Sequence, residues 1–272
     1  MECKILNVMA VENVVIITIS LIAGVVNSVA SHDLEGFVVG GKRAKIEDFP
    51  HSVFLYIECF IGYTTTYACG ASILNQAIVL TAAHCLVQCQ EDSTFLAAYV
   101  GDFVAGGGSS YSADNYKLHE NFDEKEISSD IALVRLEKNI KFGKNVRRVS
   151  LMRNPPYKKY AKVAGWGYTD PETKDQSAVL MQASQRVRTR PKCVIMLDRI
   201  TPEGTICGGS KNAKSYVTKG DSGSALMALK YIQIGIVSYK DLTRSKSVCI
   251  YTDVAYFYDW VKTNSRSMYC EL

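Results

Sequence analysis

The chain alternates short apolar segments with turn residues, a pattern typical of β-strands rather than of long helices. The segments are rich in β-branched residues or alternate apolar and polar positions, and Gly, Pro, Asn and Asp separate them. Near the end, Val254 to Thr263 places Tyr256 and Trp260 four residues apart, which predicts an amphipathic helix. Short strands at regular spacing predict an all-β protein built as barrels or a sandwich. The predicted strands are Ser52–Ile57, Ser72–Leu74, Ile78–Leu80, Ile131–Val134, Ala161–Ala164, Ser224–Met227 and Ile232–Val237.

The first thirty residues differ from the rest and predict a cleaved secretory signal, residues 1–30. Lys4 gives a positive start, Val14–Val26 is almost continuously apolar, and Ser28-Val29-Ala30 offers small residues where a signal peptidase cuts. A membrane anchor is the alternative, but the apolar run is shorter than the roughly 20 residues that span a bilayer. We therefore expect a secreted, extracellular protein with no membrane partner.

Composition supports a folded domain and excludes some partners. The 272 residues are 47% hydrophobic, enough for a large core, and the net charge is only +4. Because no long basic run is present, no nucleic-acid partner is expected. Nine cysteines fit an oxidising compartment, where Cys3 leaves with the signal. No Cys/His spacing typical of a metal site is present, so neither a metal nor a cofactor is expected.

The stretch Thr218–Leu226 carries the strongest sign of chemistry, because it contains Gly-Asp-Ser-Gly around Ser222. A serine hydroxyl is a poor nucleophile at neutral pH, and it needs a base as well as amide donors for the oxyanion that forms. The glycines let the backbone turn sharply, so the N–H groups of Gly220 and Ser222 can converge on one point. For this stretch alone, an ordinary Gly-Ser turn is the alternative interpretation.

Two upstream segments supply what this serine needs. His84 lies in Leu80–Cys85 between small residues and a cysteine, and Asp130 stands at the mouth of a predicted strand. His, then Asp, then Ser is the chain order of the chymotrypsin arrangement and differs from that of other serine hydrolases. On these motifs the sequence resembles the chymotrypsin/trypsin-like serine protease family from Val38 to about Lys262. A weaker resemblance is to insect scolexin-type haemolymph proteins.

The resemblance implies two packed six-stranded antiparallel β-barrels with a C-terminal helix. Residues 38–150 would form the first barrel, and residues 151–272 the second barrel and the helix. Lys138–Lys159, rich in charge and containing Pro155-Pro156, is the expected crossing between them. The active site would then lie in the cleft where the barrels meet.

The resemblance also assigns roles to individual residues. His84 would act as general base toward Ser222 and then as general acid toward the leaving amine. Asp130 would hold the imidazole tautomer with help from Ser238, and the N–H groups of Gly220 and Ser222 would form the oxyanion hole. Taken alone, an Asp before an apolar strand is more often a turn residue. The other histidines of the mature chain, His51 and His119, are expected at the surface or in loops.

A zymogen is expected because Val38-Val39-Gly40-Gly41 resembles the mature N-terminus of the family. Residues 31–37 would be the activation peptide, and the freed α-amino group of Val38 would pair with Asp221. Gly165-Trp166-Gly167 resembles the loop that packs near this aspartate. Phe37 departs from the usual Arg or Lys before the cut, so the activator would cleave after an aromatic residue or the chain would activate itself. A strand that begins with a Gly-Gly turn is the alternative.

The resemblance implies a disulfide between Cys69 and Cys85, which steadies the histidine loop, and a second between Cys193 and Cys207. Two further cysteines flank the first pair and could form a third bridge. They are Cys59 and Cys89. The pairing of Cys249 and Cys270 stays open.

The expected substrate pocket departs from the family pattern. Tyr216 aligns with its floor, and Lys240 and Cys249 align with wall positions that are usually glycine. Ser238 and Tyr239 belong to the strand that lines up with the substrate, and Tyr239 stands where the family usually has Trp. Cleavage after Arg or Lys is therefore not expected. Small or medium apolar residues are expected before the scissile bond, with aromatic residues as the alternative.

Together these features predict a secreted serine endopeptidase, a hydrolase made as a zymogen. Its partners would be protein or peptide substrates and a protein inhibitor. The alternative is a protease-like binding or clotting protein with little turnover. A lectin or a structural β domain would leave the match of the three segments unexplained.

Overall fold

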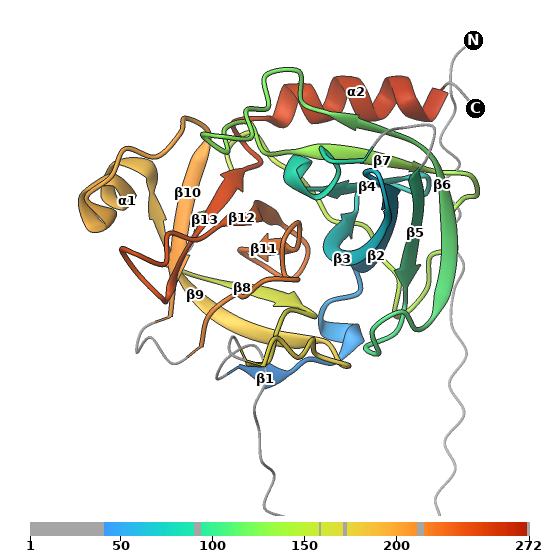
Figure 1. Ribbon diagram of the computed structural model, residues 1–272, viewed down its shortest axis with the longest axis horizontal. Coiled ribbons are helices and arrows are strands. Elements are labelled where there is room, and N and C mark those ends of the chain that lie inside the picture. Colours follow the sequence, from blue (N-terminus) through green and yellow to red (C-terminus); the bar gives the residue numbers. More distant parts are fainter. Residues whose placement is uncertain (1–40, 90–93, 158, 171–172, 211–214, 271–272) are drawn as a thin grey trace, which may run out of the picture. The chain divides into compact units, whose positions relative to one another are not determined.

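Antiparallel strands dominate the protein in a computed structural model (Figure 1). The structure describes residues 41–89, 94–157, 159–170, 173–210 and 215–270, all of which belong to one compact unit. The predicted signal, residues 1–30, the predicted activation peptide, residues 31–37, and Val38 lie outside the described residues.

Six strands close the first barrel in the order β2-β3-β4-β7-β6-β5, and β5 pairs with β2 to complete the ring. Along β2, the side chains of Val53, Leu55 and Ile57 point inward and are fully buried, while those between them are partly exposed. This alternation is the period of two that a strand with one buried face requires. The strands are β2 (Ser52–Phe60), β3 (Thr64–Ile73), β4 (Ile78–Thr81), β5 (Thr94–Val100), β6 (Ser109–Leu118) and β7 (Ala132–Leu136).

A second ring runs in the order β9-β10-β13-β12-β11-β8, and the pairing of β8 with β9 closes it. A short strand, β1 (Lys42–Arg43), adds to β9 outside this ring. The core of this second barrel contains the fully buried side chains of Leu226, Ile234 and Tyr251. The strands are β8 (Tyr160–Gly165), β9 (Met181–Thr189), β10 (Thr205–Gly209), β11 (Ala225–Met227), β12 (Gln233–Tyr239) and β13 (Val248–Asp253). The expected fold class of two six-stranded barrels with a C-terminal helix is confirmed.

The C-terminal helix begins later than the sequence pattern predicts. It is α2 (Tyr258–Cys270), whereas the prediction started at Val254. Residues 254–257 are turns, because Asp253 Oδ1 accepts the N–H of Ala255 at 3.1 Å and anchors the chain there. Val261 and Met268 of the helix are buried against the core of the first barrel. Among the described residues, no helix combines the length and apolar character that crossing a membrane requires.

Three other helical segments stand outside the barrel walls. They are η1 (Ile46–Asp48), η2 (Ala83–Cys85) and α1 (Arg190–Leu197). The residues between β7 and β8 connect the two barrels. Within this connection, Val149 donates its N–H to Ile73 O at 2.8 Å, and Ser150 bridges to Ile232. The connection therefore touches both barrels, and the domain limits at residues 150 and 151 stay a prediction.

The two barrels come into direct contact at the turn that carries Ser222. The N–H of Gly70 in β3 donates to Ser222 O at 2.7 Å. Gly223 has φ +82°, and a Cβ there would overlap the carbonyl oxygen of Gly70 and the hydroxyl of Thr81. Glycine is required at this position both for its backbone conformation and for the close approach of the first barrel.

His51 and His119 were expected at the surface or in loops, and His51 lies in the turn before β2 but is buried. Its side chain is only 2% exposed, and its ring lies edge-on to Phe49 with centroids 6.1 Å apart. His119 is half-buried and packs against Phe257 and Trp260. The turn before β2 is covered by neighbouring chain, a tertiary effect that the local sequence does not encode.

Candidate active site

A helical turn and a disulfide hold His84 at the edge of the first barrel. η2 follows β4 almost directly, and Cys85 is bonded to Cys69 of β3. Tyr67 donates its hydroxyl to Cys85 O at 2.9 Å, which fixes the same turn from the other side. The side chain of His84 keeps 26% of its surface exposed. One edge of the ring is therefore held by the protein while another edge can reach a ligand.

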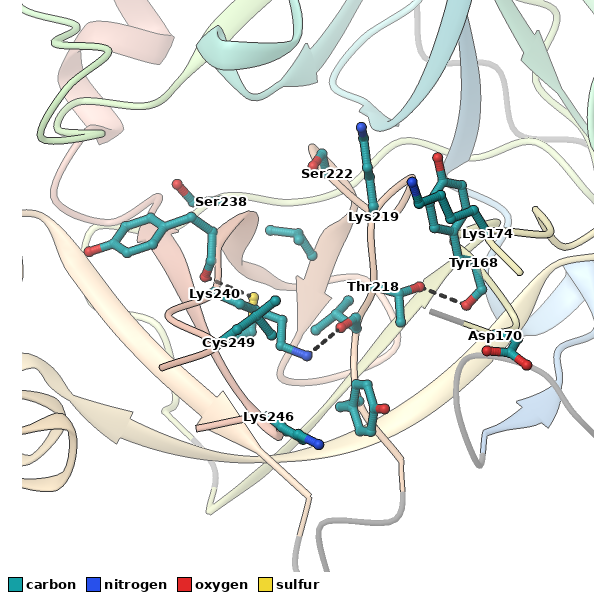
Figure 2. A pocket seen from close by; sticks show the side chains of 15 residues that line it. Tyr168, Asp170, Lys174, Thr218, Lys219, Ser222, Ser238, Lys240, Lys246 and Cys249 are labelled. Carbon is teal, nitrogen blue, oxygen red and sulfur yellow. Dashed lines mark hydrogen bonds between the residues drawn. The ribbon is translucent and has the colours of Figure 1, made fainter. Parts of the chain in front are cut away.

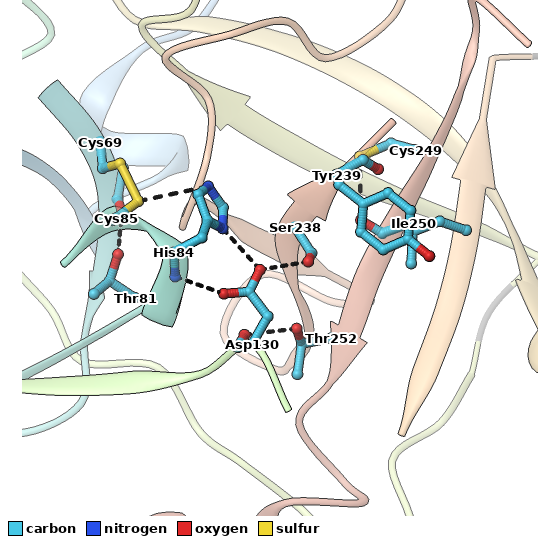
Figure 3. A network of polar contacts seen from close by, with 11 residues as sticks. Cys69, Thr81, His84, Cys85, Asp130, Ser238, Tyr239, Cys249, Ile250 and Thr252 are labelled. Atoms are coloured by element: carbon cyan, nitrogen blue, oxygen red, sulfur yellow. Dashed lines mark hydrogen bonds and ion pairs between the residues drawn. A yellow bond between two sulfur atoms is a disulfide. The ribbon is translucent and has the colours of Figure 1, made fainter. Parts of the chain in front are cut away.

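Asp130 contacts His84 through two hydrogen bonds, as Figure 3 shows. Its Oδ2 lies 2.8 Å from His84 Nδ1, and its Oδ1 accepts the backbone N–H of His84 at 2.9 Å. The hydroxyl of Ser238, from β12 of the second barrel, donates to the same Oδ2. Thr252 donates its hydroxyl to Asp130 O at 2.7 Å. Asp130 is 1% exposed, and both barrels fix it.

The pair is electrostatically suited to hold a proton on His84. Burial raises the pKa of Asp130, but the charge of His84 and the hydrogen bonds from His84 and Ser238 outweigh it, so the pKa lies below its ordinary value. Burial likewise lowers the pKa of His84, and the Asp130 carboxylate more than offsets this, so the pKa is raised. A carboxylate only accepts hydrogen bonds, which places the proton of the neutral ring on Nδ1. Nε2 is then left as the basic nitrogen.

Ser222 sits on a tight turn at the edge of the second barrel. Gly220 and Gly223 on either side have φ +94° and +82°, a region that side chains with a Cβ rarely adopt. Gly223 donates its N–H to Val237 O at 2.8 Å and Ser224 donates to Asp221 O at 3.0 Å, so both ends of the turn are fixed. The backbone conformation is therefore well determined around the serine.

The N–H groups of Gly220 and Ser222 donate to no residue within the described ranges. Backbone N–H groups in a folded interior are almost always paired, so two unused donors on one turn indicate a place for an anionic oxygen. In the described part of the chain, Ser222 Oγ also makes no hydrogen bond to His84. The structure thus brings His84 and Asp130 into contact and leaves Ser222 without a direct bond to them.

Asp221 is a buried carboxylate beside the serine. Its Oδ1 accepts the N–H of Gly167 at 2.8 Å and its Oδ2 accepts the N–H of Thr218 at 2.8 Å. Burial raises the pKa of Asp221 to about 6, although these hydrogen bonds act in the opposite direction. The charge of Lys240 also lowers this pKa, but it does not offset the effect of burial. The expected contact between Asp221 and the loop at Gly167 is present, while Val38 lies outside the described range.

A cleft of about 680 Å³ opens beside Ser222, and Figure 2 shows its lining. The five predicted pocket residues Tyr216, Ser238, Tyr239, Lys240 and Cys249 all line it. Cys249 is almost completely buried, and burial raises the pKa of its thiol to about 12, so it contributes a neutral group. The cleft is open in spite of the side chains that replace glycine at its walls.

Sequence reasoning missed several residues of this cleft. Val217, Lys219 and Val237 neighbour predicted residues in the chain and could have been found from that proximity. The remaining ones come from loops whose approach no local pattern signals. They are Tyr168, Asp170, Lys174, Leu242 and Lys246.

Three disulfides are present among the described cysteines. Cys69 pairs with Cys85 and Cys193 pairs with Cys207, and Cys59 pairs with Cys89 to form the third bridge. Cys249 and Cys270 are free. The three bridges constrain the histidine loop and the junction between α1 and β10.

Comparison with known proteins places the chain in a family. A model of the family described as Trypsin matches residues 38–261. The chain therefore belongs to the trypsin family. Hypodermin-B of Hypoderma lineatum is 30% identical over 241 residues, which cover 86% of this chain and 90% of that protein. Trypsin epsilon of Drosophila erecta is 28% identical over 253 residues, with 91% and 94% covered.

Solved structures share the fold. HL collagenase superposes with a TM-score of 0.71 at 24% identity, covering 84% of this chain and 98% of that one. The scabies mite inactivated protease paralogue S-D1 gives a TM-score of 0.72 at 22% identity, covering 85% and 98%. Similarity at this level of identity supports the two-barrel architecture.

Proposed function

We propose that this protein is a secreted serine endopeptidase in which His84, Asp130 and Ser222 form the catalytic triad. The observation that carries the proposal is the double contact of Asp130 with His84, at 2.8 Å and 2.9 Å, in a chain that also presents Ser222 on a tight glycine turn. The relatives trypsin epsilon and hypodermin-B support the same class of activity.

The proposed reaction begins when His84 Nε2 accepts the hydroxyl proton of Ser222 as its Oγ attacks the peptide carbonyl. The carbonyl oxygen becomes an oxyanion, and the two unused N–H groups of Gly220 and Ser222 bind it. Asp130 stabilises the imidazolium that forms. His84 then gives the proton to the leaving amine, and water attacks the acyl-enzyme by the same route in reverse.

Activation would occur by cleavage between Phe37 and Val38. The new α-ammonium group of Val38 would pair directly with Asp221, because the hydrogen bonds to that buried carboxylate come from neutral donors and the charge of Lys240 offsets its burial only in part. Asp221 directly precedes Ser222, so its position sets that of the oxyanion hole. The uncut chain would accordingly be a zymogen.

Secretion is proposed on two grounds. The N-terminal apolar run of residues 14–26 fits a signal sequence, residues 1–30. The three disulfides require an oxidising compartment such as the secretory pathway. Proteins or peptides would be the substrates, and a protein inhibitor of the cleft a further partner.

A protease-like binding or clotting protein with little turnover is the second candidate. Two observations favour it: Ser222 Oγ has no hydrogen bond to His84 among the described residues, and Lys240 extends into the substrate cleft. Hydrogen bonds between nucleophile and base are often absent before substrate binds, however, so the first observation does not oppose catalysis.

Hydrolysis of an unfolded protein decides between the two. The chain is produced with an engineered cleavage site directly before Val38, cut, and incubated with casein. We expect time-dependent release of peptides by the wild-type protein and none by Ser222→Ala. Equal and negligible release by both would overturn the endopeptidase proposal and favour the binding protein.

A further inference from the structure

The ammonium group of Lys240 lies inside the substrate cleft and contacts no carboxylate of a described residue directly. Lys240 follows β12 directly, and its side chain runs into the cleft, as Figure 2 shows. Its Nζ donates to Val217 O at 3.0 Å and lies 4.0 Å from the centroid of the Tyr216 ring. No carboxylate of a described residue lies within 4.0 Å of this nitrogen. An ammonium has three N–H donors, so donor capacity remains for a ligand.

Most of the other charges around the cleft are positive. Among the described lining residues, the only carboxylate is that of Asp170, which stands against four lysines. The charge of Asp221 acts to raise the pKa of Lys240, but Asp221 forms no ion pair with it, and its two oxygens already accept the N–H groups of Gly167 and Thr218. The thiol of Cys249 is neutral because burial raises its pKa to about 12. The lysines are Lys174, Lys219, Lys240 and Lys246.

Burial makes the unpaired charge of Lys240 costly. The side chain is half-buried, and burial lowers its pKa below that of a free lysine. The face of Tyr216 and a carbonyl oxygen stabilise the ammonium in part. A carboxylate brought in by a ligand would supply the missing counter-charge, whereas an Arg or Lys side chain would be repelled. An uncharged side chain would cover the ammonium without pairing it.

The position of this nitrogen changes the expectation from sequence. From the sequence, Lys240 was expected to stand in the pocket wall and narrow the pocket. That expectation favoured substrates with a small apolar residue before the scissile bond. The structure shows that its Nζ reaches the pocket floor beside Tyr216, so the cleft is charged where an apolar side chain would end.

We propose that the activated protein selects an acidic residue, Glu or Asp, before the scissile bond, and that Lys240 is the residue that determines this specificity. The inference rests on the proposed function, since it names the substrate class of the same site.

The experiment compares peptides that differ only in the residue before the scissile bond. Glu is paired with Gln, and Asp with Asn, because each pair matches in size and differs in charge; an Arg peptide is included. Protein cut before Val38 is first titrated with a fluorophosphonate, so that rates refer to reactive serine. We expect kcat/KM for Glu to exceed that for Gln by about tenfold or more, as for a charge-assisted hydrogen bond in a partly buried site.

Two variants then test whether Lys240 causes the preference for Glu. Lys240→Met keeps the length of the side chain and removes its charge, and the Glu to Gln ratio should fall to about one or below. Lys262→Met removes an exposed lysine of α2 that does not line the cleft, and it should keep the wild-type ratio.

The outcomes separate the two proposals. Protein that takes up no fluorophosphonate overturns the proposed function together with this inference. Labelled protein that cleaves the Gln or Arg peptide as well as the Glu peptide overturns the acidic preference alone. A preference for Glu that survives in Lys240→Met overturns the assignment to Lys240, and the wild-type comparison stands even if that variant fails to fold.

Discussion

Asp130 binds His84 through both of its carboxylate oxygens, one on the ring Nδ1 at 2.8 Å and one on the backbone N–H at 2.9 Å. The two residues lie 46 positions apart in the chain, and the contact joins the end of β4 to the start of β7. Because the aspartate holds the backbone as well as the ring, it fixes the direction of the imidazole with little freedom left.

Replacing Asp130 should weaken catalysis and shift its pH dependence. In Asp130→Asn the ring loses the carboxylate that fixes its tautomer, because the amide NH2 can donate to Nδ1, and kcat/KM should fall by roughly a thousandfold or more. The carboxylate raises the pKa of His84, and only the neutral ring is a base, so wild-type activity should rise as the pH increases through that raised pKa. The acidic limb should move to lower pH in the variant. Rates measured between about pH 5 and 9 test this, with the exposed Asp48→Asn as a control; an unshifted limb would contradict the role of Asp130.

Asp221 should matter only after the chain has been cut. In protein that begins at Val38, Asp221→Asn cannot pair with the new ammonium, and activity should fall by about a hundredfold or more because the oxyanion hole is not held in place. The uncut variant and the uncut wild type should be equally inactive. Peptide hydrolysis before and after cutting is the measurement, and the exposed Glu137→Gln serves as the matched control. Full activity in cut Asp221→Asn would rule out this switch.

His51 should make the fold sensitive to acid. Burial lowers the pKa of His51 to about 4, so the native ring stays neutral while the unfolded chain takes up a proton below about pH 6.5. Its contribution to stability is therefore complete above about pH 6.5 and is lost as the pH falls through about 4, on the order of 3 kcal/mol in total. His51→Phe, which keeps the packing on Phe49, should lose less stability over this range.

The effect of His51 on the pH dependence of stability is the difference between the wild type and His51→Phe. In the uncut chain Asp221 acts in the opposite direction: burial raises its pKa to about 6, so its contribution is full below about pH 3.8 and is lost as the pH rises through about 6. This contribution is common to the wild type and to His51→Phe and cancels between them. Denaturant unfolding at several pH values supplies the data, and identical pH dependence of the two proteins would refute the assignment.

Gly223 should tolerate no side chain. Alanine there would take a φ of +82° and overlap Gly70 O and the hydroxyl of Thr81, so Gly223→Ala should destabilise the protein by several kcal/mol or prevent folding. Gly143→Ala is the matched control, because a Cβ at Gly143 meets nothing within 4 Å. Thermal unfolding of the two variants gives the comparison. Similar melting temperatures would show that the barrels are not packed closely at this turn.

The sequence was most informative where chemistry requires local patterns. Small residues flank His84, a strand starts just after Asp130, and glycines flank Ser222. The structure brings His84 and Asp130 into contact. The distance of Ser222 from His84 could not be predicted, because it depends on how two barrels pack. The same holds for His51, whose burial comes from neighbouring chain and not from its own segment.

Several strands escaped the pattern for physical reasons. β6 is largely polar and keeps no fully buried side chain, so it lacks the apolar alternation that marks a strand. β10 is short and ends in two glycines. Glycines are unfavourable in strands, so the sequence pattern predicts a turn there. In the cleft, alignment predicted which positions line the pocket, but the direction of the Lys240 side chain required the structure.

Mapping a covalent adduct tests the central claim most directly. Protein cut before Val38 is treated with a fluorophosphonate, digested, and analysed by mass spectrometry. We predict one adduct per chain on Ser222, no labelling of Ser222→Ala, and strongly reduced labelling of His84→Ala and of the uncut protein. Folded protein beginning at Val38 that remains unlabelled, or an adduct on a residue other than Ser222, would contradict the account.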